Sequence, residues 1–115
     1  MESKELAKLI ADYSLEKKAE DVVLLNLKDV TTITDYFIIC SADSDVQVKA
    51  ITDNIIGRLK EQKIKVWHTE GYQSLKWVLL DLVDVVVHVF QPETRDFFGL
   101  EKLWGDAEIT KVEDL

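Results

Sequence analysis

One stretch of fourteen residues, WVLLDLVDVVVHVF from Trp77 to Phe90, most limits the folds open to this chain. Two apolar runs rich in β-branched residues flank a short acidic break, which is the pattern of two strands joined by a turn. Asp81 and Asp84 bracket the reversal. We therefore predict a buried hairpin with strands at 77–80 and 85–90, the second of which contains a histidine.

Helical patterns begin the chain, follow the second predicted strand and return near the end. In the first segment an apolar face has the i, i+3, i+4, i+7 spacing of a helix and consists of Leu6, Leu9, Ile10 and Tyr13. Ser44 and Gln47 form an S-x-x-Q capping box, which predicts a second helix that starts there and ends near Gln62. Helical spacing resumes over 94–104, where Gly99 predicts a break into two short helices.

Strand patterns at 21–27, at 36–41 and from Ile64 onward complete the set. Helices and strands in this mixed order predict a single compact α/β domain, with a mixed sheet of about five strands flanked by helices. A chain of 115 residues without repeats or an internal linker is the size of one domain. We assign residues 1–107 to this domain and expect 108–115 to be a loosely held acidic tail.

Charge and composition limit the partners. The chain has 22 acidic and 14 basic residues, a net charge of −8, and no cluster of lysines or arginines dense enough to follow a phosphate backbone. We expect little direct contact with nucleic acid and a surface suited to a basic protein, although the same charge also serves solubility. A single cysteine, the lack of a secretory signal and the lack of a long apolar run predict a cytoplasmic protein without a membrane segment.

Residues able to carry catalysis are few. His68, His88 and Cys40 lack the spacing of a zinc site, and no glycine-rich phosphate-binding motif occurs. Cys40 is interpreted as a small buried hydrophobic residue, with a nucleophilic pair of Cys40 and His88 as the alternative. We expect no catalytic residue, no metal and no cofactor.

Asp81 and Asp84 raise one enzymatic alternative, a nucleotidyltransferase-type enzyme that binds Mg²⁺ through an aspartate cluster completed by Asp43 or Asp35. The spacing argues against it, because residues two apart share a strand face and residues three apart across a turn do not. The favoured interpretation is that these aspartates end strands and cap turns.

Strand alternation poses a question about His88. Val85, Val87 and Val89 project to one face of the predicted strand, and His88 with its neighbours at 86 and 90 projects to the other. His88 is then either a core histidine under a layer of helices or part of a partner-binding face. The same choice applies to Trp77 and Trp104, since large aromatic residues occupy cores and also anchor interfaces.

The segments DYFIICSADSDVQVKAI and TEGYQSLKWVLLDLVDVVVHVFQPETRDFFGLEKLWGDA, with the amphipathic start, resemble the ribosomal silencing factor family, RsfS, also called Iojap. The likeness runs roughly from Leu6 to Ala107. It implies a nucleotidyltransferase-like fold without enzymatic activity. It also implies binding to the large ribosomal subunit through its ribosomal protein fourteen, which blocks joining of the small subunit and represses translation when nutrients are short. Family members commonly form homodimers.

By position, the matching motif residues expected at the contact are Glu70, Trp77, Asp84 and His88, with Tyr36 and Trp104 as neighbours. The chain departs from the family in two places. The family usually has Tyr-Gly-Asp at the hairpin turn, where this chain has Leu82-Val83-Asp84. The loop at 73–76 also lacks a glycine that often precedes the tryptophan.

Overall fold

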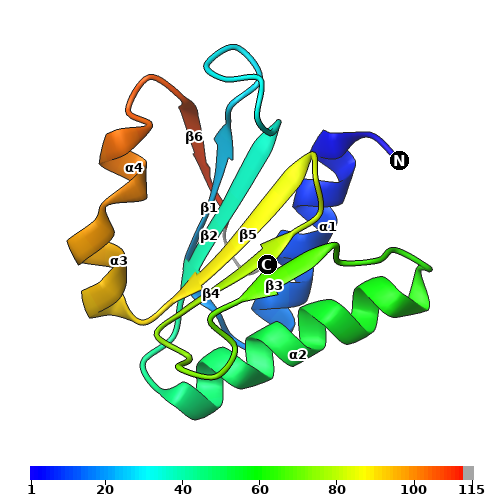
Figure 1. Ribbon diagram of the computed structural model, residues 1–115, viewed down its shortest axis with the longest axis vertical. Coiled ribbons are helices and arrows are strands. Elements are labelled where there is room, and N and C mark those ends of the chain that lie inside the picture. Colours follow the sequence, from blue (N-terminus) through cyan, green and yellow to red (C-terminus); the bar gives the residue numbers. More distant parts are fainter. Residues whose placement is uncertain (113–115) are drawn as a thin grey trace.

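A mixed sheet forms the middle layer of the protein (Figure 1). The computed structural model describes residues 1–112. Its strands are β1 (Glu20–Asn26), β2 (Tyr36–Ser41), β3 (His68–Glu70), β4 (Trp77–Asp81), β5 (Val85–Phe90) and β6 (Glu108–Lys111). They lie in the order β3-β4-β5-β2-β1-β6, with β2 and β5 parallel and every other neighbouring pair antiparallel. The predicted α/β class and mixed sheet are confirmed, with six strands rather than five.

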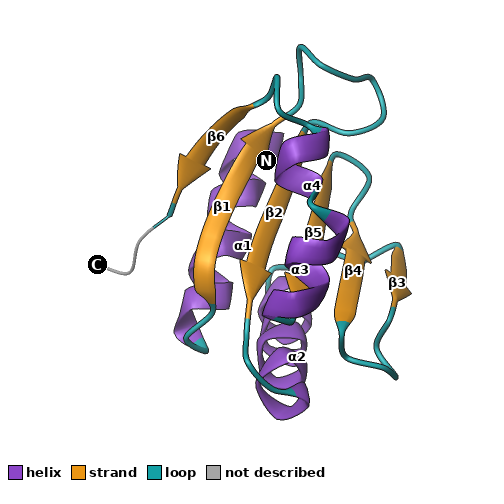
Figure 2. Cartoon of the chain, turned by 90° about the vertical axis from the view of Figure 1, so that its left-hand side faces the viewer, coloured by secondary structure: helices purple, strands orange, loops and turns teal. Residues whose placement is uncertain are grey.

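Four helices cover the two faces of the sheet. They are α1 (Ser3–Glu16), α2 (Asp45–Glu61), α3 (Pro92–Phe98) and α4 (Leu100–Leu103). Figure 2 shows α3 and α4 in front of the sheet and α1 and α2 behind it. Gly99, with a φ of 54°, separates α3 from α4, so the predicted break is confirmed. Within residues 1–112 no helix combines the length and the apolar character needed to cross a membrane.

The start of α2 matches half of the predicted capping box. The Ser44 hydroxyl accepts a hydrogen bond from the Gln47 backbone N–H at 3.1 Å, as an N-cap serine should. The Gln47 side chain does not reach back to Ser44 and instead donates to the Lys17 carbonyl oxygen at the end of α1. The second half of the box is thus replaced by a contact that ties α2 to α1.

Both faces of the central strands are buried, which explains their nearly continuous apolar sequence. Val85, Val87 and Val89 pack into the core beneath α1 and α2, together with the apolar side of α2. Phe90 and Ile39 pack into a smaller core on the α3–α4 side. The alternation predicted for 85–90 is therefore confirmed.

The hairpin of β4 and β5 is also confirmed, with Trp77 opposite Phe90 and Leu79 opposite His88. Its turn contains Val83 at a φ of 74°, in the left-handed region that a β-branched residue rarely occupies. The turn is closed by the Leu82 N–H, which donates to the Val85 carbonyl at 2.9 Å. The backbone at this turn therefore has the conformation that a glycine adopts most easily.

Two expectations for the edges of the sheet are wrong. The strand expected from Ile64 begins only at His68, because Ile64 and Val66 pack against the core after α2 ends instead of joining a ladder. At the other edge, Glu108–Lys111 is not a loose acidic tail but strand β6, which pairs with β1. The acidic residues Glu113 and Asp114 of the expected tail lie outside the described residues.

Candidate functional site

Aromatic side chains gather on the α3–α4 side of the sheet. We call this surface the aromatic face, and its members are Phe37, Trp77, Phe97, Phe98, Leu103 and Trp104. The rings of Trp77 and Phe98 have centroids 4.7 Å apart, and those of Phe97 and Phe98 lie at 5.1 Å. Phe97 is 82% exposed and Leu103 is 71% exposed. Exposed aromatic and aliphatic groups packed in one cluster are typical of a surface that binds another macromolecule.

Strand alternation and one sharp corner place these side chains together. Trp77 and Phe37 project from β4 and β2 toward α3 and α4, since their neighbours in sequence point into the opposite core. Pro92 begins α3 at a position where its missing N–H costs nothing, and Gly99 redirects the chain into α4. The two short helices then present Phe97 and Leu103 to solvent.

Arg95 fixes this corner to the sheet. Its buried guanidinium donates to the Asp21 carbonyl and to the Ser41 hydroxyl, both at 2.8 Å. The same group donates to the two Glu101 carboxylate oxygens at 3.3 and 3.2 Å. Arg95 lies on α3 and Glu101 on α4, so one residue connects both helices to β1 and β2. Charge-assisted bonds of this kind hold a surface in one geometry.

His88 lies beneath the aromatic face. Its side chain is 3% exposed, and its Nδ1 accepts a hydrogen bond from the Trp77 indole N–H at 3.0 Å. This bond assigns the proton of the neutral ring to Nε2, which has no partner within residues 1–112. Burial lowers the pKa of His88 to about 3, so the ring is neutral at physiological pH. The structure therefore places His88 in the core, where it orients Trp77.

Acidic groups border the aromatic face on the β3 side. Glu70 pairs with Leu79 across the β3–β4 ladder, and Asp81 follows Leu79 by two positions on β4. Paired and alternate residues share a sheet face, so Glu70 and Asp81 lie on the same side as Trp77. The Glu70 carboxylate also contacts the His68 Nε2 at 2.9 Å. An apolar centre with an acidic border is suited to a basic protein surface.

Two of the residues expected at the contact lie outside the aromatic face. Tyr36 projects to the opposite face of β2 and is buried in the core beneath α1 and α2. Asp84 lies exposed at the hairpin turn, where its carbonyl accepts the N–H groups of Asp35 and Tyr36 at 3.0 and 3.2 Å. The structure thus groups Trp77 and Trp104 with His88 below and Glu70 at the border, but not Tyr36 or Asp84.

Several members of the aromatic face were not predicted from the sequence. Phe37 takes the place expected for Tyr36, because successive strand residues alternate between faces. Phe97 and Leu103 were predicted only as apolar positions of the helical spacing over 94–104, and the structure exposes both; Phe98 was not singled out. The sequence gives no decisive signal here, because two adjacent residues on a helix lie about 100° apart and can share a buried stripe or divide between core and solvent.

The geometry does not assemble the catalytic alternatives. Cys40 projects into the core beneath α1 and α2, on the opposite side of the sheet from His88, and burial raises the pKa of its thiol to about 12. Asp43 follows the end of β2, whereas Asp84 precedes the start of the parallel strand β5. The six-residue strand puts these carboxylates roughly 20 Å apart. Within residues 1–112 no three His, Cys, Asp or Glu side chains are grouped to hold a metal ion.

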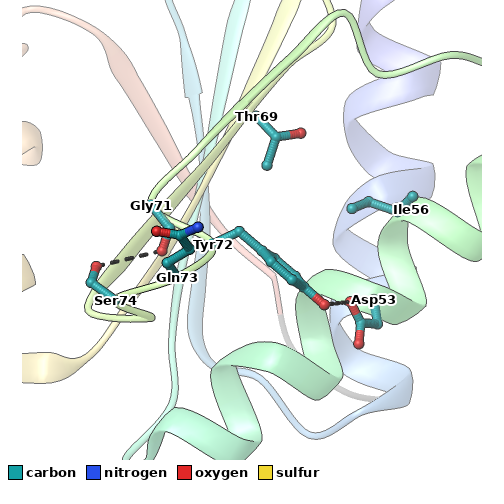
Figure 3. Close-up of a pocket in the computed structure, with 7 residues that line it drawn as sticks. All are labelled: Asp53, Ile56, Thr69, Gly71, Tyr72, Gln73 and Ser74. Carbon is teal, nitrogen blue, oxygen red and sulfur yellow. Dashed lines mark hydrogen bonds between the residues drawn. The ribbon is translucent and has the colours of Figure 1, made fainter.

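A large hollow of about 760 Å³ lies on the other side of the sheet, between α2 and the loop after β3 (Figure 3). Tyr72 spans it and donates from its hydroxyl to Asp53 Oδ1 at 2.6 Å, while Lys49 pairs with Asp53 Oδ2 at 2.9 Å. Gly71 begins the loop with a φ of 80°, and a Cβ there would lie 1.9 Å from the Trp77 carbonyl oxygen. The bonds of Tyr72 and Lys49 to Asp53 fasten the loop after β3 to α2 across this hollow.

Comparison with known proteins gives consistent matches. A family model described as "Ribosomal silencing factor during starvation" matches residues 1–115. The chain is 45% identical over 113 residues to a protein named ribosomal silencing factor RsfS from Halalkalibacterium halodurans, covering 98% of this chain and 97% of that protein. The protein of the same name from Bacillus subtilis is 42% identical, covering 98% and 96%. A crystal structure of a protein from Chromobacterium violaceum superposes with a TM-score of 0.88 at 34% identity, covering 99% of this chain and 95% of that one.

Proposed function

This chain belongs to the ribosomal silencing factor family, and we propose that it binds the large ribosomal subunit through ribosomal protein fourteen of that subunit. Bound there, it blocks joining of the small subunit and represses translation when nutrients are short. The proposed role is cytoplasmic and non-enzymatic, and the free protein is proposed to be a homodimer.

The observation that carries this proposal is the aromatic face with its acidic border. Phe97 and Leu103 are exposed on the two short helices that the Arg95 bonds hold against the sheet. Burial of an exposed phenylalanine side chain contributes about 2 kcal/mol to association. Glu70 and Asp81 at the border favour encounter of the aromatic face with a basic protein and disfavour binding of this face to surrounding RNA.

The mechanism requires only occupancy. A folded domain of 13.2 kDa seated where two subunits must close excludes the second subunit by volume. Free factor at ~100 times its dissociation constant opposes joining by about 2.7 kcal/mol. The block therefore depends on the concentration of the factor and is relieved by dilution.

Co-sedimentation with purified large subunits, followed by light scattering of subunit joining, tests the proposal. Phe97→Ala should weaken binding roughly ten-fold or more without loss of stability, because the side chain is 82% exposed in the free protein. Val46→Ala is the matched control, since Val46 is exposed on α2, on the other side of the sheet. Normal joining in the presence of saturating wild-type protein would exclude the proposed function. Equal binding of both variants would exclude the aromatic face as the contact.

A further inference from the structure

A groove at the end of α2 has a charge opposite to that of the molecule as a whole. Its hollow of about 420 Å³ is lined by Ile56, Lys60, Lys63, Ile64, Lys65, Val66 and Thr69. We call this surface, together with the adjacent Trp67, the lysine groove. Three lysines and no acidic residue line it, although the chain carries a net charge of −8. The net charge predicts little contact with nucleic acid, but the local charge of this groove is positive.

The lysines of the groove are not neutralised. Within residues 1–112, none of the three forms an ion pair, and the two glutamates closest to the groove in sequence contact other groups. Glu61 accepts from Arg58 at 2.9 Å, and Glu70 contacts the His68 ring at 2.9 Å on the other face of β3. The positive charge of the groove therefore faces solvent.

Trp67 adds a flat apolar surface beside these charges. It is 69% exposed, and the Lys65 ammonium lies 5.7 Å from the centroid of its indole ring. An exposed indole next to lysines is the combination by which proteins stack on bases while binding phosphates. An acidic polypeptide would also be attracted by the lysines. Unlike a nucleic acid, however, it does not carry an aromatic base at each unit on which Trp67 could stack.

The groove is separated from the aromatic face. Its lining residues come from the end of α2, the segment after it and β3, and the aromatic face lies on the other side of the sheet. Figure 1 shows α2 on one side of the sheet and α3 and α4 on the other. One molecule can therefore use both surfaces at once.

We propose that the lysine groove binds single-stranded RNA, and that it contacts exposed RNA of the large subunit while the aromatic face binds protein. The ribosomal source of the RNA rests on the proposed function, whereas binding to free RNA does not. Contact of three lysines with three phosphates predicts a slope of log K against log salt of about −2, since a single strand contributes about −0.7 per contact. Affinity should then fall roughly eighteen-fold between 50 and 200 mM salt.

A matched pair of variants makes the test specific. α2 ends in a Schellman motif with Lys63 at a φ of 60°, and α1 ends in the same motif with Lys18 at a φ of 62°. Lys63→Gly and Lys18→Gly each remove one positive charge and relieve the same left-handed backbone. Only the first removes a charge from the groove.

The measurement is a ¹⁵N NMR titration of the labelled protein with short oligoadenylate, at several salt concentrations. We expect shifts centred on the Trp67 indole N–H and on residues of the groove, and a salt slope that becomes shallower by about 0.7 in Lys63→Gly but not in Lys18→Gly. Shifts outside the groove, equal behaviour of the two variants, or binding of oligoglutamate in place of RNA would overturn the proposal.

Co-sedimentation separates this inference from the proposed function. Wild-type protein that fails to bind large subunits overturns the ribosomal role. The comparison is with a triple variant, Lys60→Ala, Lys63→Gly, Lys65→Ala. If the variant and the wild-type protein bind large subunits equally tightly and with the same salt dependence, the RNA contact alone is overturned. A loss of affinity and a shallower salt slope in the triple variant support both.

Discussion

Replacement of Val83 by glycine should stabilise the protein, although it removes a hydrophobic side chain. Val83 has a φ of 74° at the turn between β4 and β5, and a β-branched residue in this conformation is strained by about 2 kcal/mol. Glycine relieves that strain but adds freedom to the unfolded chain, which costs about 0.7 kcal/mol. The side chain is 54% exposed, so the lost burial costs about 0.7 kcal/mol more.

The balance is a gain of about 0.6 kcal/mol in the free energy of unfolding, or roughly 3 °C in Tm for a domain of this size. Urea denaturation followed by circular dichroism measures it as a higher midpoint with an unchanged m-value. Val83→Thr keeps the branching and the strain and should gain nothing. Val46→Gly makes the same chemical change in the first turn of α2 and should be destabilising by about 0.5 kcal/mol. If Val83→Gly loses as much stability as Val46→Gly, the argument from backbone strain is wrong.

Two further predictions concern the core and the loop seam. Burial lowers the pKa of His88 from 6.5 to about 3, so between these pH values the unfolded chain binds a proton that the folded protein does not. Stability should therefore fall as pH drops below 6.5, by at most about 1.4 kcal/mol per pH unit, and pH-dependent urea melts of His88→Gln should lack that component of the slope. Gly71→Ala should be destabilising by about 3 kcal/mol, because its Cβ would lie 1.9 Å from the Trp77 carbonyl oxygen and its φ is 80°. A melting curve of Gly71→Ala identical to that of the wild type would contradict the close approach.

The elements that could be predicted from sequence are those whose pattern is complete within a few residues. The hairpin of β4 and β5 follows from two β-branched runs and a turn, and the alternation along β5 assigns each valine to its face. The start of α2 follows from the Ser44 cap. Each of these depends on contacts between residues close in sequence.

The elements that were missed depend on contacts that only the folded chain supplies. The segment EITK at 108–111 is mostly polar and becomes a strand because β1 would otherwise leave an edge unpaired. Ile64 and Val66 alternate like strand residues, yet their apolar side chains are satisfied by packing beside α2.

The candidate site shows the same division. Trp77 stands out in sequence because it is a large residue in a short motif, and the structure places it at the centre of the aromatic face. Tyr36 and Phe37 are adjacent aromatic residues on a strand buried on both sides, so apolar character alone does not tell which one faces α3 and α4. The three lysines of the lysine groove lie within residues 60–65, but the negative net charge of the whole chain does not reveal this local positive charge.

The parallel pair of β2 and β5 has a consequence for how the chain folds. Tyr36 lies opposite Val85, so the middle of the sheet joins segments roughly fifty residues apart, and β6 then closes on β1 from the far end of the sequence. Such non-local pairing slows folding toward the millisecond-to-second range, because the entropy cost of closing a large loop is incurred before the strand contacts that offset it can form. A nascent chain that has not yet released β5 from the exit tunnel has no partner for β2 on that side. Until β5 emerges, that edge of the hydrophobic strand β2 stays unpaired, and unpaired strand edges are prone to aggregation.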